Sequence, residues 1–380
     1  MERNRFLNYL IIALYTFVVH FTYFLLAIFL AGRGLGGGRT GFLLMLYTAT
    51  ALFGSFLIGF FEDRFGARGN TLFGLALVFL FYLGLAFARG FPSMVALFFI
   101  GGLGNNVVRV TMNALFLKSH DPSRQGREIG LYTFLPQFSM GTGVIAGSLL
   151  LTAMDFRTVF LSSSAILLAL VGCAALLRPA SLSAGPLSMY GRDLAKRRVL
   201  LFVAALVLFC LHWGAEIACY APFLRDDLGL GTASSGIFMG VPIVFLGCVS
   251  YYFGVRRDRG DSSVRLVLVA IALSGAGLIA FGAMKNVAAA FAFRLVHEAG
   301  DAAFTVFSYV GIARLFPRER LGGTSGSMFV AMVSAQSVGA LVFGWMGGAF
   351  GYPAAYLAAG ACSLAAIPLI LSASAEYHYH

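Results

Sequence analysis

The stretch Gly59-Phe60-Phe61-Glu62-Asp63-Arg64-Phe65-Gly66-Ala67-Arg68 decides how the rest of this chain is interpreted. It lies between two long apolar runs, so it predicts a short charged turn that joins two helices. Gly59 would let a neighbouring helix approach closely, and Asp63 and Arg64 can pair with groups at helix ends. Ordinary membrane topology also produces charged turns, so this turn alone leaves both interpretations open.

The turn resembles the loop between helices 2 and 3 of the major facilitator superfamily, whose pattern is G-x-x-x-D-R-x-G-R-[RK]. The basic end of the pattern is weakened here, because Ala67 stands at the first basic position and Gly69 follows Arg68. The resemblance implies a cytoplasmic gate and conformational lock. The residues expected to form it are Gly59, Asp63, Arg64, Gly66 and Arg68, together with Asp258 and Arg259 in a second copy of the turn.

An internal repeat aligns three separate loops at one offset of 195 residues. Parallel halves related in this way are typical of the major facilitator fold. We therefore predict an all-α membrane protein with two six-helix halves, residues 1–177 and 199–380, joined by a cytoplasmic linker at 178–198. The matching pairs are Gly34 with Gly229, Gly59 with Gly254, Asp63 with Asp258, Arg64 with Arg259 and Pro122 with Pro317.

The composition excludes a soluble protein, because 59% of the residues are hydrophobic and only 11% are charged, against roughly 25% charged in soluble domains. Apolar runs of about 20 residues cross the hydrocarbon core of a bilayer. The first run is too long for a signal-peptide core and is expected to remain as a helix. The twelve predicted spans are 7–31, 40–61, 70–88, 93–117, 129–152, 157–177, 199–224, 234–255, 264–283, 287–314, 322–346 and 352–372.

The positive charges are distributed unevenly between the loops. A net charge of +11 would suggest nucleic acid in a soluble chain, but in a membrane chain the distribution of Lys and Arg sets the orientation, and no nucleic-acid partner is expected. With both termini in the cytoplasm, six of the 27 basic residues lie outside, Arg109 and Arg294 lie within helices, and 19 lie in cytoplasmic segments. Because the loops are short, we expect a bacterial inner-membrane protein.

Ionisable groups inside the predicted spans gather on only four of them: 7–31, 93–117, 199–224 and 287–314. Each such group costs about 2.5–3.5 kcal/mol on insertion scales, so it needs a partner or a watery cavity. In the major facilitator superfamily the corresponding helices line a central cavity, and the resemblance implies one here. The expected substrate- and proton-binding residues are His20, Asn106, Arg109, His212, Glu216, Arg294, His297, Glu298 and Asp301.

The roles of these groups remain open on sequence grounds. Arg294 with Glu298 and His297 with Asp301 are spaced at i, i+4, which suits a proton relay or ion pairs that only neutralise the helix. Arg109 can bind an anionic group of the substrate or hold a carboxylate from the other half. Residues expected to line the cavity wall are Tyr132, Gln137, Trp213 and Gln336.

No phosphate-binding loop of the ATPase kind and no metal-ligand spacing is present, so we expect no enzyme activity, cofactor or metal. The antiporter motif of the superfamily's helix 5 is incomplete, because Gly130, Gly143 and Gly147 match it but its proline is missing. The sequence favours a monomeric secondary active transporter in the lipid bilayer, which exports a small amphipathic organic molecule by proton-coupled alternating access. The alternatives are uptake or symport of an organic anion or nutrient, and a non-transporting sensor.

Overall fold

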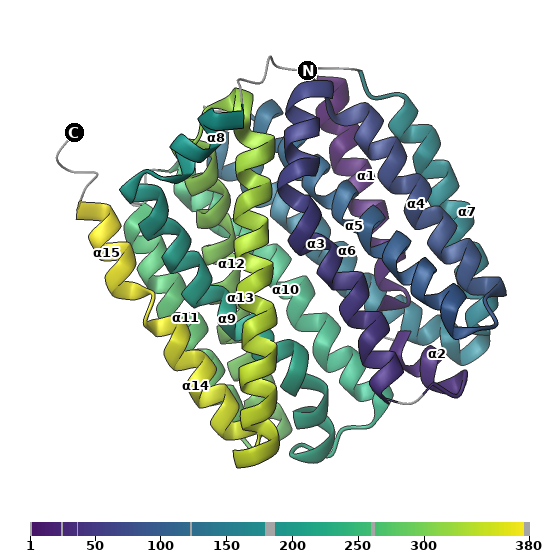
Figure 1. Ribbon diagram of the computed structural model, residues 1–380. Helices are drawn as coiled ribbons and strands as arrows, with labels where there is room; N and C mark the ends of the chain where they lie inside the picture. Colours follow the sequence, from purple (N-terminus) through teal and green to yellow (C-terminus); the bar gives the residue numbers. More distant parts are fainter. Residues whose placement is uncertain are drawn as a thin grey trace. The chain divides into compact units, whose positions relative to one another are not determined.

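The computed structural model describes residues 2–23, 26–35, 37–121, 124–178, 187–259 and 263–375, and every regular element in these ranges is a helix (Figure 1). The elements are α1 (Glu2–His20), α2 (Leu26–Gly32), α3 (Gly37–Phe65), α4 (Ala67–Phe87), α5 (Phe91–Ser119), α6 (Gln125–Ala153), α7 (Phe156–Ala175), α8 (Leu187–Leu194), α9 (Arg197–Asp226), α10 (Thr232–Asp258), α11 (Ser263–Ala283), α12 (Val287–Leu315), η3 (Arg318–Arg320), α13 (Leu321–Phe350), α14 (Tyr352–Leu364) and α15 (Ile367–Ala375).

Nine helices in the described part of the chain are long and apolar enough to cross a membrane, and a bent pair within α3 makes a tenth. α12 is not counted among these helices, because the charged groups in its interior lower its mean hydropathy. The predicted span 7–31 falls on α1 and α2, and 352–372 falls on α14 and α15. The prediction of a multi-pass helical membrane protein is therefore confirmed, whereas the count of twelve spans is not confirmed in full.

The described chain divides into two compact units. Unit 1 comprises residues 1–120, 139–185 and 317–330, and unit 2 comprises residues 121–138, 186–316 and 331–380. The first turns of α6, up to Phe138, belong to unit 2, and the first turns of α13, up to Val330, belong to unit 1. Most of the predicted linker 178–198 lies outside the described residues, and its end contains α8.

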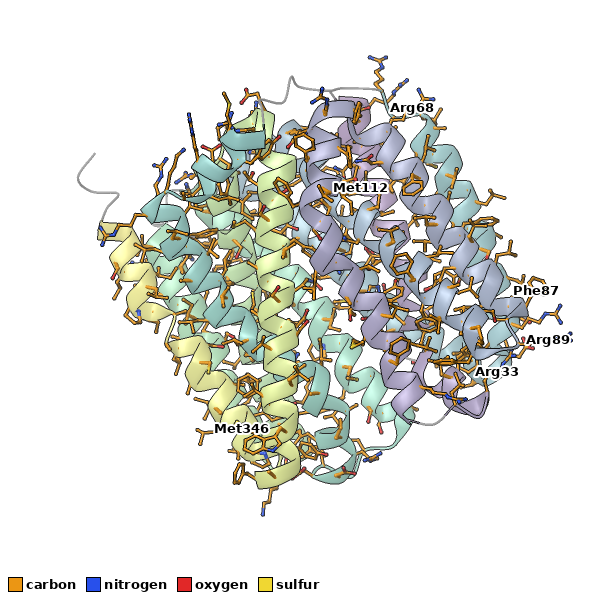
Figure 2. The ribbon with its side chains drawn as sticks, in the orientation of Figure 1. Arg33, Arg68, Phe87, Arg89, Met112 and Met346 are labelled. Atoms are coloured by element: carbon orange, nitrogen blue, oxygen red, sulfur yellow. The ribbon has the colours of Figure 1, made fainter. Side chains whose placement is uncertain are left out.

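In unit 1, α5 is an interior helix that packs against α1, α3 and α4, while α7 covers α4 and α1 (Figure 1). Small residues make this packing close: a Cβ at Gly102 of α5 would lie 2.1 Å from the backbone oxygen of Tyr47 in α3. Figure 2 shows Arg68 at one end of this unit and Arg33 and Arg89 at the other.

In unit 2, α11 lies between α12 and α14, and α9 packs on α14 and α15. Aromatic side chains fill the core where these helices meet, and the fully buried rings include Phe223, Phe281 and Tyr356. The rings of Phe223 and Phe281 have centroids 5.0 Å apart in an edge-on arrangement, which the charge distribution of aromatic rings favours. This core holds α9, α11 and α12 in a fixed arrangement around their polar groups.

Two loop glycines support the internal repeat. Gly34 and Gly229, which the 195-residue offset aligns, have φ angles of 76° and 67°. Left-handed backbone of this kind strongly favours glycine, so the two positions share a conformation as well as a residue type. The repeat is therefore visible in the local backbone of the two loops.

Candidate functional site

A buried cluster of charged side chains lies in unit 2 between α9 and α12. α9 contributes His212 and Glu216 one turn apart, and α12 contributes the other members. His212 and His297 are 0% exposed, and no other member of the α12 set exceeds 3%. Inside a helix the backbone N–H and C=O groups bond one another and are not free to bind these side chains. The charged side chains therefore need partners among themselves. The charged members of the cluster are His212, Glu216, Arg294, His297, Glu298 and Asp301.

Arg294 joins two carboxylates. Its Nη1 donates to Glu216 Oε1 across the helix pair, and its Nη2 donates to Glu298 Oε1 at 2.5 Å. The predicted i, i+4 pair of Arg294 with Glu298 is therefore present. The guanidinium also lies over the ring of Tyr220, with Cζ 4.4 Å from the ring centroid. The Arg294 guanidinium thus contacts two carboxylates and the face of one aromatic ring. Glu216 remains partly accessible, with 19% of its side chain exposed.

Asp301 is the second centre of the cluster. His212 Nε2 lies 3.2 Å from its Oδ2, Trp213 Nε1 donates to the same oxygen at 2.6 Å, and Ser274 Oγ donates to Oδ1 at 2.7 Å. The predicted i, i+4 partner His297 is more distant, 3.9 Å from Oδ1. Trp213, expected on a cavity wall, instead holds this carboxylate. Asp301 therefore connects α9, α11 and α12.

Both imidazoles of the cluster have an acceptor at each ring nitrogen. His297 places Nδ1 2.9 Å from the backbone oxygen of Ser274 and Nε2 2.7 Å from Glu216 Oε1. His212 places Nδ1 2.5 Å from the backbone oxygen of Phe209 and Nε2 against Asp301. A ring with two acceptors satisfies both only as an imidazolium, whereas His212 Nδ1 also has a hydroxyl, Ser363 Oγ, at 2.9 Å that can donate to it. With both rings charged the cluster contains three cations and three carboxylates and is neutral, and with His212 neutral it carries a net charge of −1.

The same groups have the spacing of a metal site, because His212, Glu216 and His297 offer ligand atoms within 4.8 Å of one another. Glu216 Oε1, however, already accepts from Arg294 and His297. A guanidinium on a ligand oxygen repels a metal cation, and the hydrogen bonds described above satisfy these atoms without one. The donor set therefore fits a hydrogen-bonded ion-pair network better than a metal centre.

Ser274 was not identified from the sequence, although its side chain bonds Asp301. Its position follows from close helix packing: a Cβ at Gly300 of α12 would lie 2.2 Å from Ser274 N, and one at Gly277 of α11 would lie 2.6 Å from His297 N. The signal that could have found it is the run Ser274-Gly275-Ala276-Gly277, in which small residues permit such an approach. Ser363 of α14 completes the cluster, with Oγ 2.9 Å from His212 Nδ1.

Among the residues of unit 1 that the structure describes, the charged side chain in the interior of a helix is that of Arg109 in α5. Between residues 101 and 120 of this interior helix, only Arg109 is exposed. Its Cζ lies 5.2 Å from the ring centroid of Phe329, and it interacts electrostatically with His20 and Tyr23 of the same unit. His20 Nδ1 lies 2.7 Å from the backbone oxygen of Thr16. The structure therefore places His20 and Arg109 in one region.

Asn106, expected to bind substrate, is 1% exposed, and its Oδ1 accepts from Ser55 Oγ at 2.9 Å. Its neighbour Asn105 is the more accessible of the two, and it accepts from Tyr15 Oη at 2.7 Å. Asn106 therefore forms a buried hydrogen bond that connects α5 with α3. Of the expected wall residues in unit 2, Tyr132 is buried against Tyr309, and Gln137 and Gln336 are half-buried.

The charged stretch predicted as a turn is helical up to Phe65, and Asp63 in the last turn of α3 holds the first turn of α13. Asp63 accepts from the backbone N–H of Gly322 and Gly323 at 2.9 and 2.8 Å, and Lys118 Nζ lies 2.7 Å from Asp63 Oδ1. A carboxylate at a helix N-terminus satisfies donors that the helix itself leaves open. Contact is close because a Cβ on Gly59 would lie 2.1 Å from the Gly322 oxygen.

The second copy of the turn makes the same arrangement at the start of α6. Asp258 accepts from the backbone N–H of Gly126 and Arg127 at 2.8 and 2.7 Å. In the first copy Gly66 has a φ of 81° and its N–H bonds the Glu62 oxygen at 2.8 Å. The counterpart of Gly66 falls at 261, outside the described residues. The remaining residues of the predicted gate, Arg64, Arg68 and Arg259, are exposed.

The fold, the repeat and the paired turns agree with a comparison against protein families. The family model described as Major Facilitator Superfamily matches residues 9–284. The chain belongs to the major facilitator superfamily. Members of this superfamily are multi-pass membrane transporters, and the apolar helices of the described chain fit that class.

Similar proteins include the multidrug resistance protein MdtH of Aeromonas hydrophila, which is 26% identical over 255 residues, covering 65% of this chain and 64% of that protein. Among solved structures, the human organic anion transporter MFSD10 has a TM-score of 0.78 at 13% identity and covers 97% of this chain and 99% of its own. The Escherichia coli fucose:proton symporter FucP has a TM-score of 0.75 at 15% identity, covering 96% and 98%. These structural likenesses concern the fold alone.

Proposed function

We propose that this chain is a proton-coupled secondary transporter that exports a small amphipathic organic molecule across the bacterial inner membrane by alternating access. The observation that carries the proposal is the buried cluster of Arg294, two histidines and three carboxylates between α9 and α12, whose charges balance when both imidazoles are protonated. Its members are buried, yet Glu216 keeps 19% of its side chain exposed. Protons therefore have an entry point to an otherwise enclosed network.

The cluster supports coupling because its charges balance. A proton added to any carboxylate leaves one uncompensated positive charge among apolar helices, where charges interact more strongly than in water. A second event must offset that charge, and binding of a substrate or repacking of the helices can do so. Linkage is reciprocal, so a substrate that favours one protonation state is itself bound more tightly in that state.

Asp301 is the proposed coupling group. The polar and charged groups that face it are His212 and Trp213 from α9, Ser274 from α11 and His297 from α12. Loss of its charge leaves His212 facing a neutral side chain. Export is favoured over uptake because the MdtH relative is named as a multidrug resistance protein. Uptake or symport of an organic anion or nutrient is the second candidate, and the fucose:proton symporter fold neighbour is consistent with it.

The test uses purified full-length protein in liposomes that enclose the pH indicator pyranine. Dansylglycine, an amphipathic anion, or N-(2-aminoethyl)dansylamide, an amphipathic cation, is added outside. Proton antiport predicts that the lumen becomes more alkaline as the probe enters, whereas symport predicts that it becomes more acidic. The matched variants are Asp301→Asn and Asp155→Asn, the latter an exposed carboxylate at the start of α7.

Asp301→Asn is expected to abolish the proton signal, and Asp155→Asn to keep it. Probe entry without any pH change would contradict proton coupling. A pH change that persists in Asp301→Asn would remove this residue from the mechanism. The absence of flux for every probe, with binding retained, would favour the sensor interpretation.

A further inference from the structure

Arg109 is a membrane-embedded cation that has no ion pair with a carboxylate among the described residues of its own unit. The described carboxylates of unit 1 lie at helix ends: Glu62 and Asp63 pair with Lys118, and Asp155 accepts from Thr158 at the start of α7. Within the described residues of unit 1, the positive charge of Arg109 in the helix interior is therefore not compensated.

The carboxylates inside unit 2 are already used within that unit. Glu216 and Glu298 bind Arg294, and Asp301 is held by His212 and its neighbours. Each of them already has a partner in unit 2, so taking one of them for Arg109 would leave a buried group of unit 2 without that partner. Of the two roles that the sequence left open for Arg109, the structure favours an external anion.

Arg109 lies on a polar stripe of α5 that faces away from the lipid. Asn105, Arg109 and Asn113 are spaced four residues apart and so share one face of the helix. The other residues between 101 and 120 are buried or half-buried, since α5 packs against α1, α3, α4 and η3. An arginine facing lipid would be costly, so exposure at this position indicates an aqueous cavity.

Aromatic side chains surround the guanidinium. Phe329 lies beneath it at 5.2 Å from Cζ to ring centroid, and the ring of His20, at the end of α1, lies 5.6 Å from that of Tyr23, just after the helix. A guanidinium binds two oxygens of a carboxylate or sulfonate at once, while the rings offer an apolar surface for the rest of a ligand. The site thus combines one anion anchor with an apolar wall.

We propose that Arg109 binds the anionic head of the transported molecule, so that the substrates are amphipathic organic anions. This rests on the proposed transport function for its physiological meaning, but it concerns binding and can be tested without transport. The ligand class is an oxyanion on an apolar body. A carboxylate and a sulfonate share that chemistry, and a comparison of dansylglycine with dansyltaurine distinguishes them.

The experiment measures dansyl fluorescence on binding to the purified full chain in detergent. The ligands are dansylglycine, its neutral methyl ester and N-(2-aminoethyl)dansylamide. The wild type is expected to bind dansylglycine about 10-fold more tightly than the ester, since a charge-assisted pair contributes about that factor at a water-accessible site. Arg109→Gln should make the two ligands equal. Arg109→Lys should retain a reduced preference, because an ammonium cannot replace the bidentate fork.

Arg89→Gln is the matched control, since it removes the same charge from an exposed loop of the same unit (Figure 2). It should bind all three ligands as the wild type does. An unchanged preference for dansylglycine in Arg109→Gln, or a wild type that does not prefer the anion, would overturn the proposal. A wild type that prefers the anion, with the preference lost in Arg109→Gln but no proton movement in the liposome test, would keep this site and reject proton coupling.

Discussion

The charge balance of the cluster between α9 and α12 makes a quantitative prediction about Arg294. Replacing it with Met removes the guanidinium that donates to both Glu216 and Glu298. With both imidazoles charged, the cluster then carries a net charge of −1. Removing one partner of a buried pair typically costs about 3–5 kcal/mol, because the other charge stays buried without compensation.

A second substitution should return part of that loss. In Arg294→Met combined with Glu298→Gln, two imidazolium groups face two carboxylates, and the cluster is again neutral. We therefore expect the double variant to be more stable than Arg294→Met alone, although it has lost more native side chains. Thermal unfolding of the purified protein measures this. The single variant should melt on the order of 10 °C below the wild type, and the double variant should recover a clear part of that difference.

Additive destabilisation would refute the reasoning. If Glu298→Gln in the Arg294→Met background lowers the melting temperature further, the two side chains do not share one charge balance. The control is Arg225→Met, because Arg225 pairs with Asp226 at an exposed helix end. Its melting temperature should stay close to that of the wild type, since water screens such a pair.

Three further predictions concern local geometry. Gly59→Ala should destabilise the protein by about 1–3 kcal/mol, because the added Cβ would lie 2.1 Å from backbone atoms. In the control Gly69→Ala nothing lies within 4 Å of the added Cβ. Equal melting temperatures for the two variants would contradict the close contact at Gly59. Gly66→Ala should lower the stability of the protein by about 1–2 kcal/mol, because residues with a side chain disfavour a positive φ and φ is 81° at Gly66. An unchanged melting temperature would be inconsistent with that backbone conformation. Hydrogen bonding by Thr158 lowers the pKa of Asp155. The contribution of this carboxylate to stability is therefore present above its unfolded pKa and is lost as the pH falls through the lower, folded pKa. The gap in melting temperature between the wild type and Asp155→Ala should begin to narrow below about pH 4, and a gap that stays constant down to about pH 2 would argue against a carboxylate cap.

Much of the fold follows from sequence because hydropathy and the repeat act along the chain. Most helix boundaries lie within a few residues of the predicted spans: 93–117 became α5 at Phe91–Ser119, and 287–314 became α12 at Val287–Leu315. What hydropathy does not reveal is a break inside an apolar run. The span 352–372 is interrupted between α14 and α15, just before Pro368, which is apolar but has no backbone N–H to continue the helix.

The candidate site was partly predictable for a similar reason. Charges inside apolar helices stand out in a sequence, so Glu216 and the α12 set could be found, and the i, i+4 spacing predicted the contact of Arg294 with Glu298. Contacts between helices depend on packing angles that no local spacing encodes. Ser274 reaches Asp301 only because α11 and α12 approach closely at two glycines. The side chain of Asn106 bonds α3, whereas Asn105 lies on the more accessible face of α5.

The two copies of the charged turn differ in their burial, and that difference predicts their order of release. Asp63 is 0% exposed and also bonds Lys118, whereas Asp258 is exposed. Each carboxylate holds the first turn of a helix that runs through both units, Asp63 for α13 and Asp258 for α6. Water competes for the exposed bonds and not for the buried ones, so the first turn of α6 should open first. Hydrogen exchange followed by mass spectrometry should then show faster exchange at Gly126 than at Gly322. Equal rates at the two sites, or faster exchange at Gly322, would mean that the buried copy is not the stronger of the two attachments.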